Sequence, residues 1–101
     1  MSESKPQSPK HVQLQIQLDE DVAQGVYVNL ALVNHTETEF TIDVMYVQPQ
    51  QPKAKVRSRI ISSPKHTKRL LIALQENLRR YEERYGAVDV SGPNPADEFL
   101  Q

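Results

Sequence analysis

The chain contains no cysteine and no tryptophan, and only three of its 101 residues are glycine. The lack of cysteine excludes disulfides, thiol nucleophiles and thiolate-bound zinc or iron–sulfur sites, and it leaves the redox compartment open. Because the glycines are the isolated residues Gly25, Gly86 and Gly92, a glycine-rich phosphate-binding loop is also excluded. The length, with 38% hydrophobic and 25% charged residues, predicts a single soluble globular domain.

Long apolar runs are missing as well. No stretch approaches the roughly 20 apolar residues that a membrane-spanning helix requires. The first ten residues, MSESKPQSPK, lack the apolar core of a signal peptide. We therefore expect no membrane association and a cytoplasmic location.

Residues suited to catalysis or metal binding are few and scattered. His11, His35 and His66 lie in three separate segments, and none has a second histidine or a carboxylate at metal-ligand spacing on a helix. The acidic run Asp19–Asp21 lacks the ligand pattern of a calcium loop and predicts a solvated turn. The sequence therefore predicts no catalytic residue, no metal site, no cofactor and no small-molecule substrate. We expect the protein not to be an enzyme.

The formal net charge of −1 averages over regions of opposite sign. No acidic residue occurs between Asp43 and Glu76, and seven of the twelve basic residues fall within seventeen positions of that stretch. These seven are Lys53, Lys55, Arg57, Arg59, Lys65, Lys68 and Arg69. Charges of opposite sign gathered in separate blocks create a directional field that steers a partner or a second copy.

The composition changes at both ends of the chain. Residues 1–10 contain prolines and serines and almost no large aliphatic side chain, which predicts a disordered N-terminal arm. Residues 88–101 combine glycine, prolines and scattered acids, which predicts a flexible acidic tail. Between them, residues 11–87 are expected to form one domain in which four strands precede a helix.

Four segments carry the pattern of β-strands. Apolar residues alternate with glutamine in Val12–Leu18, a period of two that predicts a half-buried strand. Val26–Val33 is apolar on both parities, and Phe40–Val47 resumes the strand pattern after a short polar connection. Two prolines in residues 48–52 end that strand, because proline cannot donate to a ladder. In Lys53–Ile60 the cations share one parity, which predicts a fourth strand with a basic stripe.

One long helix is predicted after the strands. Ser63 is a suitable N-cap, proline is favourable at the first helical position, and Gly86 is suited to end the helix. The helix is therefore expected over Pro64–Tyr85. Spacings of three and four place an apolar stripe on it, formed by Leu71, Leu74, Leu78, Tyr81 and Tyr85.

These elements predict an α+β fold, a four-stranded antiparallel sheet followed by one long C-terminal helix in two layers. The helix is expected to cover the sheet face that carries Phe40, Ile42, Val44 and Tyr46. A chain this small buries only about 60% of its unfolded surface, and apolar residues remain on the opposite parity, so we expect a homodimer. Its candidate interface residues are Tyr27, Ala31, Val33, Met45, Val47, Tyr81 and Tyr85.

Several spaced blocks of sequence carry a family resemblance. They are Tyr27–Asn29, Glu39–Asp43, Val56–Ile61, Ser63–Leu71, Ala73–Leu78 and Tyr81–Glu82. Over residues 12–88 the chain resembles a family of short prokaryotic proteins catalogued as a domain of unknown function. The resemblance implies a strand-rich half and a terminal helix, and it implies no activity and no ligand residues. In topology alone, four strands and a helix in a dimer also resemble single-strand nucleic-acid binding modules of the PC-four, Whirly and Pur-alpha type.

Two functions are compatible with these patterns. The first is a non-enzymatic homodimeric module that recognises a protein partner as a scaffold or adaptor. The alternative is a single-stranded nucleic-acid binding protein that uses the seven clustered cations to contact phosphates. A third interpretation gives the cations no ligand, because lysines on an edge strand discourage aggregation and basic side chains can pair with Asp43 across the sheet.

Overall fold

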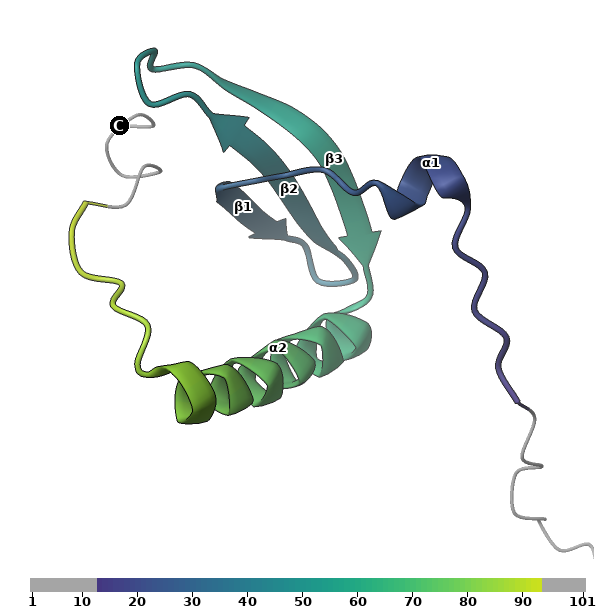
Figure 1. Ribbon diagram of the computed structural model, residues 1–101. Coiled ribbons are helices and arrows are strands. Elements are labelled where there is room, and N and C mark those ends of the chain that lie inside the picture. The colour runs from purple at the N-terminus through teal and green to yellow at the C-terminus, as the bar shows by residue number, and fades with distance from the viewer. Residues whose placement is uncertain (1–12, 94–101) are drawn as a thin grey trace, which may run out of the picture.

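The computed structural model describes residues 13–93, and among these it contains a three-stranded sheet and two helices (Figure 1). In chain order the elements are α1 (Glu20–Ala23), β1 (Leu30–His35), β2 (Phe40–Val47), β3 (Ala54–Ser62) and α2 (Pro64–Tyr85). The α+β class with a C-terminal helix is confirmed. The predicted arm 1–10 and the last eight residues of the predicted tail lie outside the described residues.

The sheet is an antiparallel meander in the order β1-β2-β3, so β2 is central. The turn between β1 and β2 is closed by the backbone N–H of Thr36, which donates to the carbonyl of Glu39 at 2.9 Å. The Thr36 hydroxyl accepts from the N–H groups of Thr38 and Glu39. A threonine that satisfies backbone donors in this way stabilises a short turn, which explains why the polar connection brings these strands together.

Asn29 anchors the start of β1 to the far end of β2. Its side-chain amide donates to the carbonyl of Val47 at 3.0 Å, and its side-chain oxygen accepts from the Val47 N–H at 2.8 Å. The backbone N–H of Asn29 also donates to the carbonyl of Met45 at 3.0 Å. The side chain therefore takes the place of a peptide group and prolongs the ladder beyond the strand itself.

A β-bulge interrupts the pairing of β2 with β3. Val44 pairs with Ser58, but Met45 pairs with Val56, so Arg57 is the extra residue. Because side chains alternate between the faces of a sheet, one extra residue reverses the parity of β3 beyond it. The residues of the predicted basic stripe therefore do not share one face.

The prediction of a first strand over Val12–Leu18 is wrong. Its described part, residues 13–18, has no regular secondary structure and lies outside the sheet, so the sheet has three strands instead of four. Instead of the predicted turn, Asp19 is the N-cap of the short helix α1, and Glu20 and Asp21 lie in its first turn. The next strand begins at Leu30 rather than at Val26. Alternation shows which side chains would share a face, but a strand also needs an edge to pair with.

The buried side chains lie on one face of the sheet, here called the core face. The antiparallel pairs Leu30 with Met45 and Leu32 with Asp43 place these residues together. Leu30, Met45 and Val47 are only 4–7% exposed, and Leu32 packs against them. The prediction that the core would form on the parity of Ile42 is wrong for the single chain. That parity forms the opposite face, here called the groove face.

Helix α2 has the predicted bounds. The Ser63 hydroxyl accepts from the His66 N–H at 3.1 Å, proline follows at the first position, and Gly86 ends the helix with a φ of 100°. However, no residue of α2 is buried, and its stripe residues Leu71, Leu74 and Tyr85 are 52–65% exposed. Figure 1 shows α2 leaving the end of β3 and lying apart from the strands. The expected close packing of this helix on its own sheet is therefore not observed.

The cap of α2 gives a first testable prediction. Replacing Ser63 with alanine removes the acceptor for the His66 N–H and should lower the free energy of unfolding by about 1 kcal/mol. Ser63→Asp restores an acceptor and should retain wild-type stability. Urea unfolding followed by circular dichroism measures both variants. Equal stability of Ser63→Ala and the wild-type protein would show that the cap does not stabilise the fold.

Candidate functional site

The first candidate surface is an apolar hollow between the groove face and α2, here called the apolar groove. It has a volume of about 410 Å³. Its walls are Ala31, Val33, Ile42, Val44 and Ile60 from the sheet and Thr67, Leu70, Leu71 and Leu74 from α2. The one polar group among these side chains, the Thr67 hydroxyl, already donates to the carbonyl of Ser63 at 2.8 Å.

The strand register and the helical repeat create this groove together. Val33 pairs with Ile42, which pairs with Ile60, so three β-branched side chains cross the sheet in one row. On α2, Leu71 and Leu74 are three residues apart and lie on the same side of the helix. The groove therefore exposes two apolar surfaces of one chain to each other and to solvent.

The strand register places the predicted dimer-interface residues on two different faces of the sheet. Ala31 and Val33 line the groove, whereas Met45 and Val47 are buried on the core face. The expectation that these four share one face is wrong, because Ala31 pairs with Val44 rather than with Met45. Two further groove residues, Ile42 and Ile60, were not predicted as interface residues, since their role depends on which strand residues are paired.

The remaining interface candidates are aromatic. Tyr81 and Tyr85 lie on the last turns of α2 with ring centroids 4.9 Å apart, and both are at least half exposed. Tyr27 precedes β1 and is 75% exposed, and its ring meets that of Tyr46 edge-on at 6.1 Å. The first two side chains therefore extend the apolar side of α2, whereas Tyr27 belongs to a different surface.

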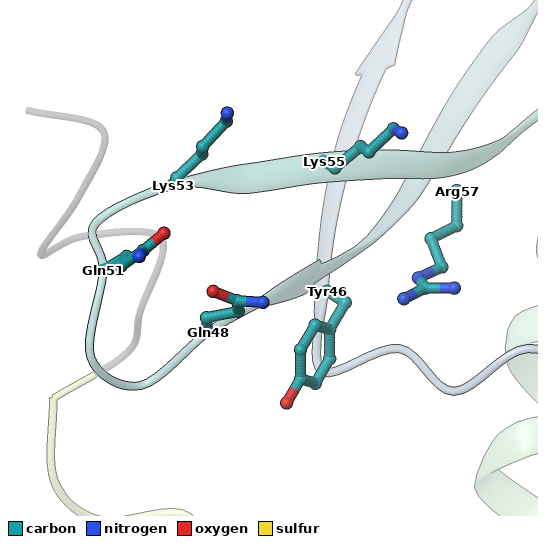
Figure 2. Close-up of a pocket in the computed structure, with 6 residues that line it drawn as sticks. All are labelled: Tyr46, Gln48, Gln51, Lys53, Lys55 and Arg57. Carbon is teal, nitrogen blue, oxygen red and sulfur yellow. The ribbon is translucent and has the colours of Figure 1, made fainter.

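That second surface is a smaller hollow of about 250 Å³ at the turn between β2 and β3, here called the basic pocket. It is lined by Tyr46, Gln48, Gln51, Lys53, Lys55 and Arg57. Figure 2 shows Tyr46 and Arg57 on one side of β3, whereas the amino groups of Lys53 and Lys55 extend on the other side of the strand. Three cations, a phenol and two amides are suited to an anionic ligand with hydrogen-bonding groups.

Arg57 is held against an aromatic ring. Its guanidinium carbon lies 5.6 Å from the ring centroid of Tyr46, within the range of a cation–π contact. None of the described ion pairs involves this arginine. The bulge therefore orients Arg57 toward an aromatic side chain, where its charge is not cancelled by a carboxylate of the described chain.

The other predicted cations do not join the basic pocket. Arg59 is bonded to Asp43 across the strands, with its Nε donating to Oδ1 at 2.7 Å and its Nη2 to Oδ2 at 3.0 Å. Lys65, Lys68 and Arg69 follow the opposite end of β3, about 30 Å from Lys53 at 3.3 Å per residue. The seven cations therefore form two separate groups and one ion pair.

The ion pair between Arg59 and Asp43 changes the titration of both groups. Hydrogen bonds and charge attraction from Arg59 lower the pKa of Asp43 below its ordinary value of 3.8, while burial acts in the opposite direction. The same contacts raise the pKa of Arg59. Asp43 is the one buried polar residue among the described residues, and the hydrogen bond from Arg59 is the main cause that stabilises its charge.

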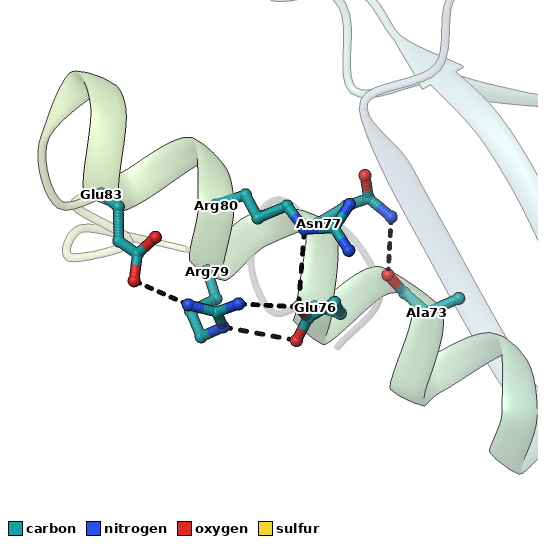
Figure 3. A network of polar contacts seen from close by, with 6 residues as sticks. All are labelled: Ala73, Glu76, Asn77, Arg79, Arg80 and Glu83. Carbon is teal, nitrogen blue, oxygen red and sulfur yellow. Dashed lines mark hydrogen bonds and ion pairs between the residues drawn. The ribbon is translucent and has the colours of Figure 1, made fainter.

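A further polar network lies on the outer side of α2 (Figure 3). Arg79 donates to Glu76 at 2.7 Å and to Glu83 at 2.6 Å, and Arg80 lies 3.5 Å from Glu76. Hydrogen bonds from Arg79 are the main cause that lowers the pKa of Glu76. Charges paired three and four residues apart stabilise the exposed side of a helix, so this network serves α2 rather than a ligand.

Residues 13–93 contain no cluster of three or more histidine, aspartate or glutamate side chains arranged to hold a metal ion. Within the same range, neither helix has the length and apolar character that crossing a membrane requires.

Comparison with known proteins identifies a family and nothing closer. A family model described as "Protein of unknown function (DUF3467)" matches residues 1–90. No curated protein and no solved structure matches the chain. The match covers most of the chain, including the sheet, α2 and both candidate surfaces.

The Asp43–Arg59 pair predicts how stability depends on pH. Since the pKa of Asp43 is lowered on folding, its ionised form stabilises the protein fully above the ordinary value of 3.8. This stabilisation is lost as the pH falls through the lowered folded value. Asp43→Asn should therefore be less stable than wild type at pH 7, and the difference should shrink toward pH 3.

Thermal unfolding measured between pH 7 and pH 3 tests this prediction. Glu37→Gln, in the exposed turn between β1 and β2, is the matched control and should follow the wild-type curve. Parallel curves for Asp43→Asn and wild type over the whole range would contradict the role given to the ion pair.

Proposed function

Because the chain belongs to the DUF3467 family of proteins of unknown function, we propose a function from the two surfaces: a homodimeric, non-enzymatic binding module. In this proposal a second copy covers the apolar groove. The basic pocket at the other end of β3 stays exposed and is available to a ligand. The observation that carries the proposal is the exposed apolar groove.

The small size of the core supports a second copy. Among the described residues, only Leu30, Met45 and Val47 are buried apolar side chains. By contrast, Leu74 is 60% exposed, and Val33 on the facing strand is 55% exposed. A domain is stable only when apolar burial offsets the conformational entropy lost on folding, and so few buried residues contribute little. A partner that covers the groove would supply the missing burial.

The length of α2 supports a copy rather than a small ligand. Its 22 residues span about 33 Å, whereas three strands are only about 14 Å wide. The distal half, with Leu78, Tyr81 and Tyr85, therefore extends beyond its own sheet. In a twofold dimer each helix can lie across the sheet of its partner, so that one kind of interface forms twice.

A second candidate function concerns the basic pocket. We propose that it binds single-stranded nucleic acid, with Lys53, Lys55 and Arg57 contacting phosphates. The nearby exposed ring of Tyr27 offers a base a stacking surface, which a duplex with paired and stacked bases would not use. This aromatic and basic combination favours a nucleic acid over an acidic protein partner, for which the aromatic ring would be unnecessary.

The homodimer can be tested with two isomeric side chains on α2. Leu74 lines the groove and is 60% exposed in the single chain, whereas Ile72 lies on the opposite side of the helix and is 55% exposed. Leu74→Glu should raise the dimer dissociation constant at least roughly 100-fold. The estimate follows from losing about 1.5 kcal/mol or more of apolar burial in each of two copies. Light scattering over a concentration series measures it.

Ile72→Glu is the matched control and should leave the dimer intact, since the two residues are almost equally exposed in the isolated chain. Equal weakening by both substitutions would mean that the groove is not the interface. A wild-type mass near 11.6 kDa at micromolar concentration would refute the homodimer itself.

The nucleic-acid candidate can be tested with two arginines, Arg57 in β3 and Arg69 in α2. Arg57→Gln should weaken binding of a labelled single-stranded oligonucleotide about tenfold or more, because a charge-assisted hydrogen bond contributes about 1.5–3 kcal/mol. It should also lower the salt dependence by about 0.7 in the slope of log K against log salt. Fluorescence anisotropy across a salt series measures both quantities.

Arg69→Gln removes the same charge from the start of α2, beyond the other end of β3, and should leave binding nearly unchanged. Equal losses for the two variants would indicate a diffuse charge effect rather than a site. The absence of binding near 50 mM salt, or equal binding of an acidic peptide, would reject the nucleic-acid candidate.

A further inference from the structure

Residues 13–18 form an apolar segment that the described part of the chain does not cover. Leu14, Ile16 and Leu18 are 85%, 86% and 66% exposed. Within residues 13–93 none of the backbone hydrogen bonds involves this segment, which has no regular secondary structure. Figure 1 shows it, in purple, leading away from the sheet beyond α1. Its strongly apolar side therefore has no partner in the described chain.

The sequence of this segment is nevertheless that of a strand. Its apolar residues alternate strictly with Gln13, Gln15 and Gln17, so an extended backbone would place all three aliphatic side chains on one face. Such a pattern is stable as a strand only when an edge provides hydrogen bonds and a packed layer covers the apolar face. Both requirements point to a surface outside the chain itself.

The outer edge of β3 offers such a surface. Among the described elements β3 pairs only with β2, so its other edge carries unpaired N–H and C=O groups. The chain around α1 already lies beside the first half of β3, because Val22 and Val26 line a hollow there with Arg57 and Ser58. The second half, Arg59–Ser62, remains open, and its Ile60 and Ile61 are 44% and 59% exposed.

We infer that two copies exchange this segment: residues 13–18 of each copy add as a fourth strand to the Arg59–Ser62 end of β3 in the other. The inference rests on the proposed homodimer. The aliphatic side chains of the added strand would lie beside Ile60 on the groove face, and its glutamines would lie on the opposite face. Each sheet then has four strands, of which one comes from the other copy.

The geometry favours a second copy as the donor. In its own chain the acid Asp21, three residues after the segment, already lines a hollow beside β3 with Arg57, and from there the segment leads away from the sheet, so it is placed to reach a second copy. A fourth strand would also widen the sheet from about 14 Å to about 19 Å. The wider groove face would then lie opposite a longer part of α2. The dimer interface would therefore be larger than the apolar groove alone.

The alternation itself provides a matched pair of variants. Ile16→Glu places a charge on the apolar parity, and Gln15→Glu places the same charge on the polar parity one residue earlier. Ile16→Glu should raise the dimer dissociation constant at least tenfold in light scattering, while Gln15→Glu should leave it unchanged. Equal effects of the two substitutions would overturn the exchange, because the side chains of adjacent residues 15 and 16 lie on opposite faces of a strand.

Engineered disulfides locate the edge, because the natural chain has no cysteine to interfere. A Gln17→Cys copy is unfolded, mixed with an Ile61→Cys copy and refolded, and the products are separated on a non-reducing gel. Gln17 and Ile61 are both expected on the core-face side, where the exchanged strand should bring them together. Asn34→Cys, on the outer edge of β1, is the control partner.

A covalent dimer of Gln17→Cys with Ile61→Cys, and not with Asn34→Cys, is the expected result. Crosslinking to Asn34→Cys would place the segment on the wrong edge and overturn the inference. If light scattering gives a dimer but neither pair crosslinks, strand exchange is rejected and the homodimer stands. If it gives a monomer for the wild-type protein, both proposals fail.

Discussion

The pairing of β2 with both of its neighbours is the constraint on which the rest of the structure depends. Asn29 fixes one end of this strand by bonding both backbone groups of Val47. On the other side, the bulge at Arg57 sets which residues of β3 face the core. These two contacts determine the small core, the row of β-branched residues in the apolar groove, and the orientation of the cations around the basic pocket.

The sequence predicts the elements that local chemistry specifies. Helix α2 has its expected bounds because Ser63, Pro64 and Gly86 act on neighbouring backbone groups. β2 is also correct, since polar and proline-containing connections bound it on both sides. By contrast, residues 13–18 have the alternating pattern of a strand but do not form one. Strand formation requires an available sheet edge to pair with, and the local sequence does not show whether one is present. Family membership was anticipated from spaced sequence blocks, and it adds no residue roles.

The candidate site was predicted only in part, for the same reason. Lys53, Lys55 and Arg57 do line one pocket, but Arg59 is taken by Asp43. A perfect alternation of cations gives no warning of a bulge, because the extra residue is defined by the partner strand. The two glutamines of the pocket come from the turn, where neither charge nor periodicity marks them. The sequence therefore shows which residue types are available for a site, but it does not show which of these residues lie together in the fold.

Only one residue, Ser63, separates β3 from α2. The direction of the helix thus depends on the two backbone angles of a single capped residue, which are −70° and 158°. Since α2 is about 33 Å long, a rotation of 10° at this joint would move its far end by about 6 Å. A small rotation of the backbone at Ser63 therefore produces a much larger displacement of Tyr81 and Tyr85 at the far end of α2.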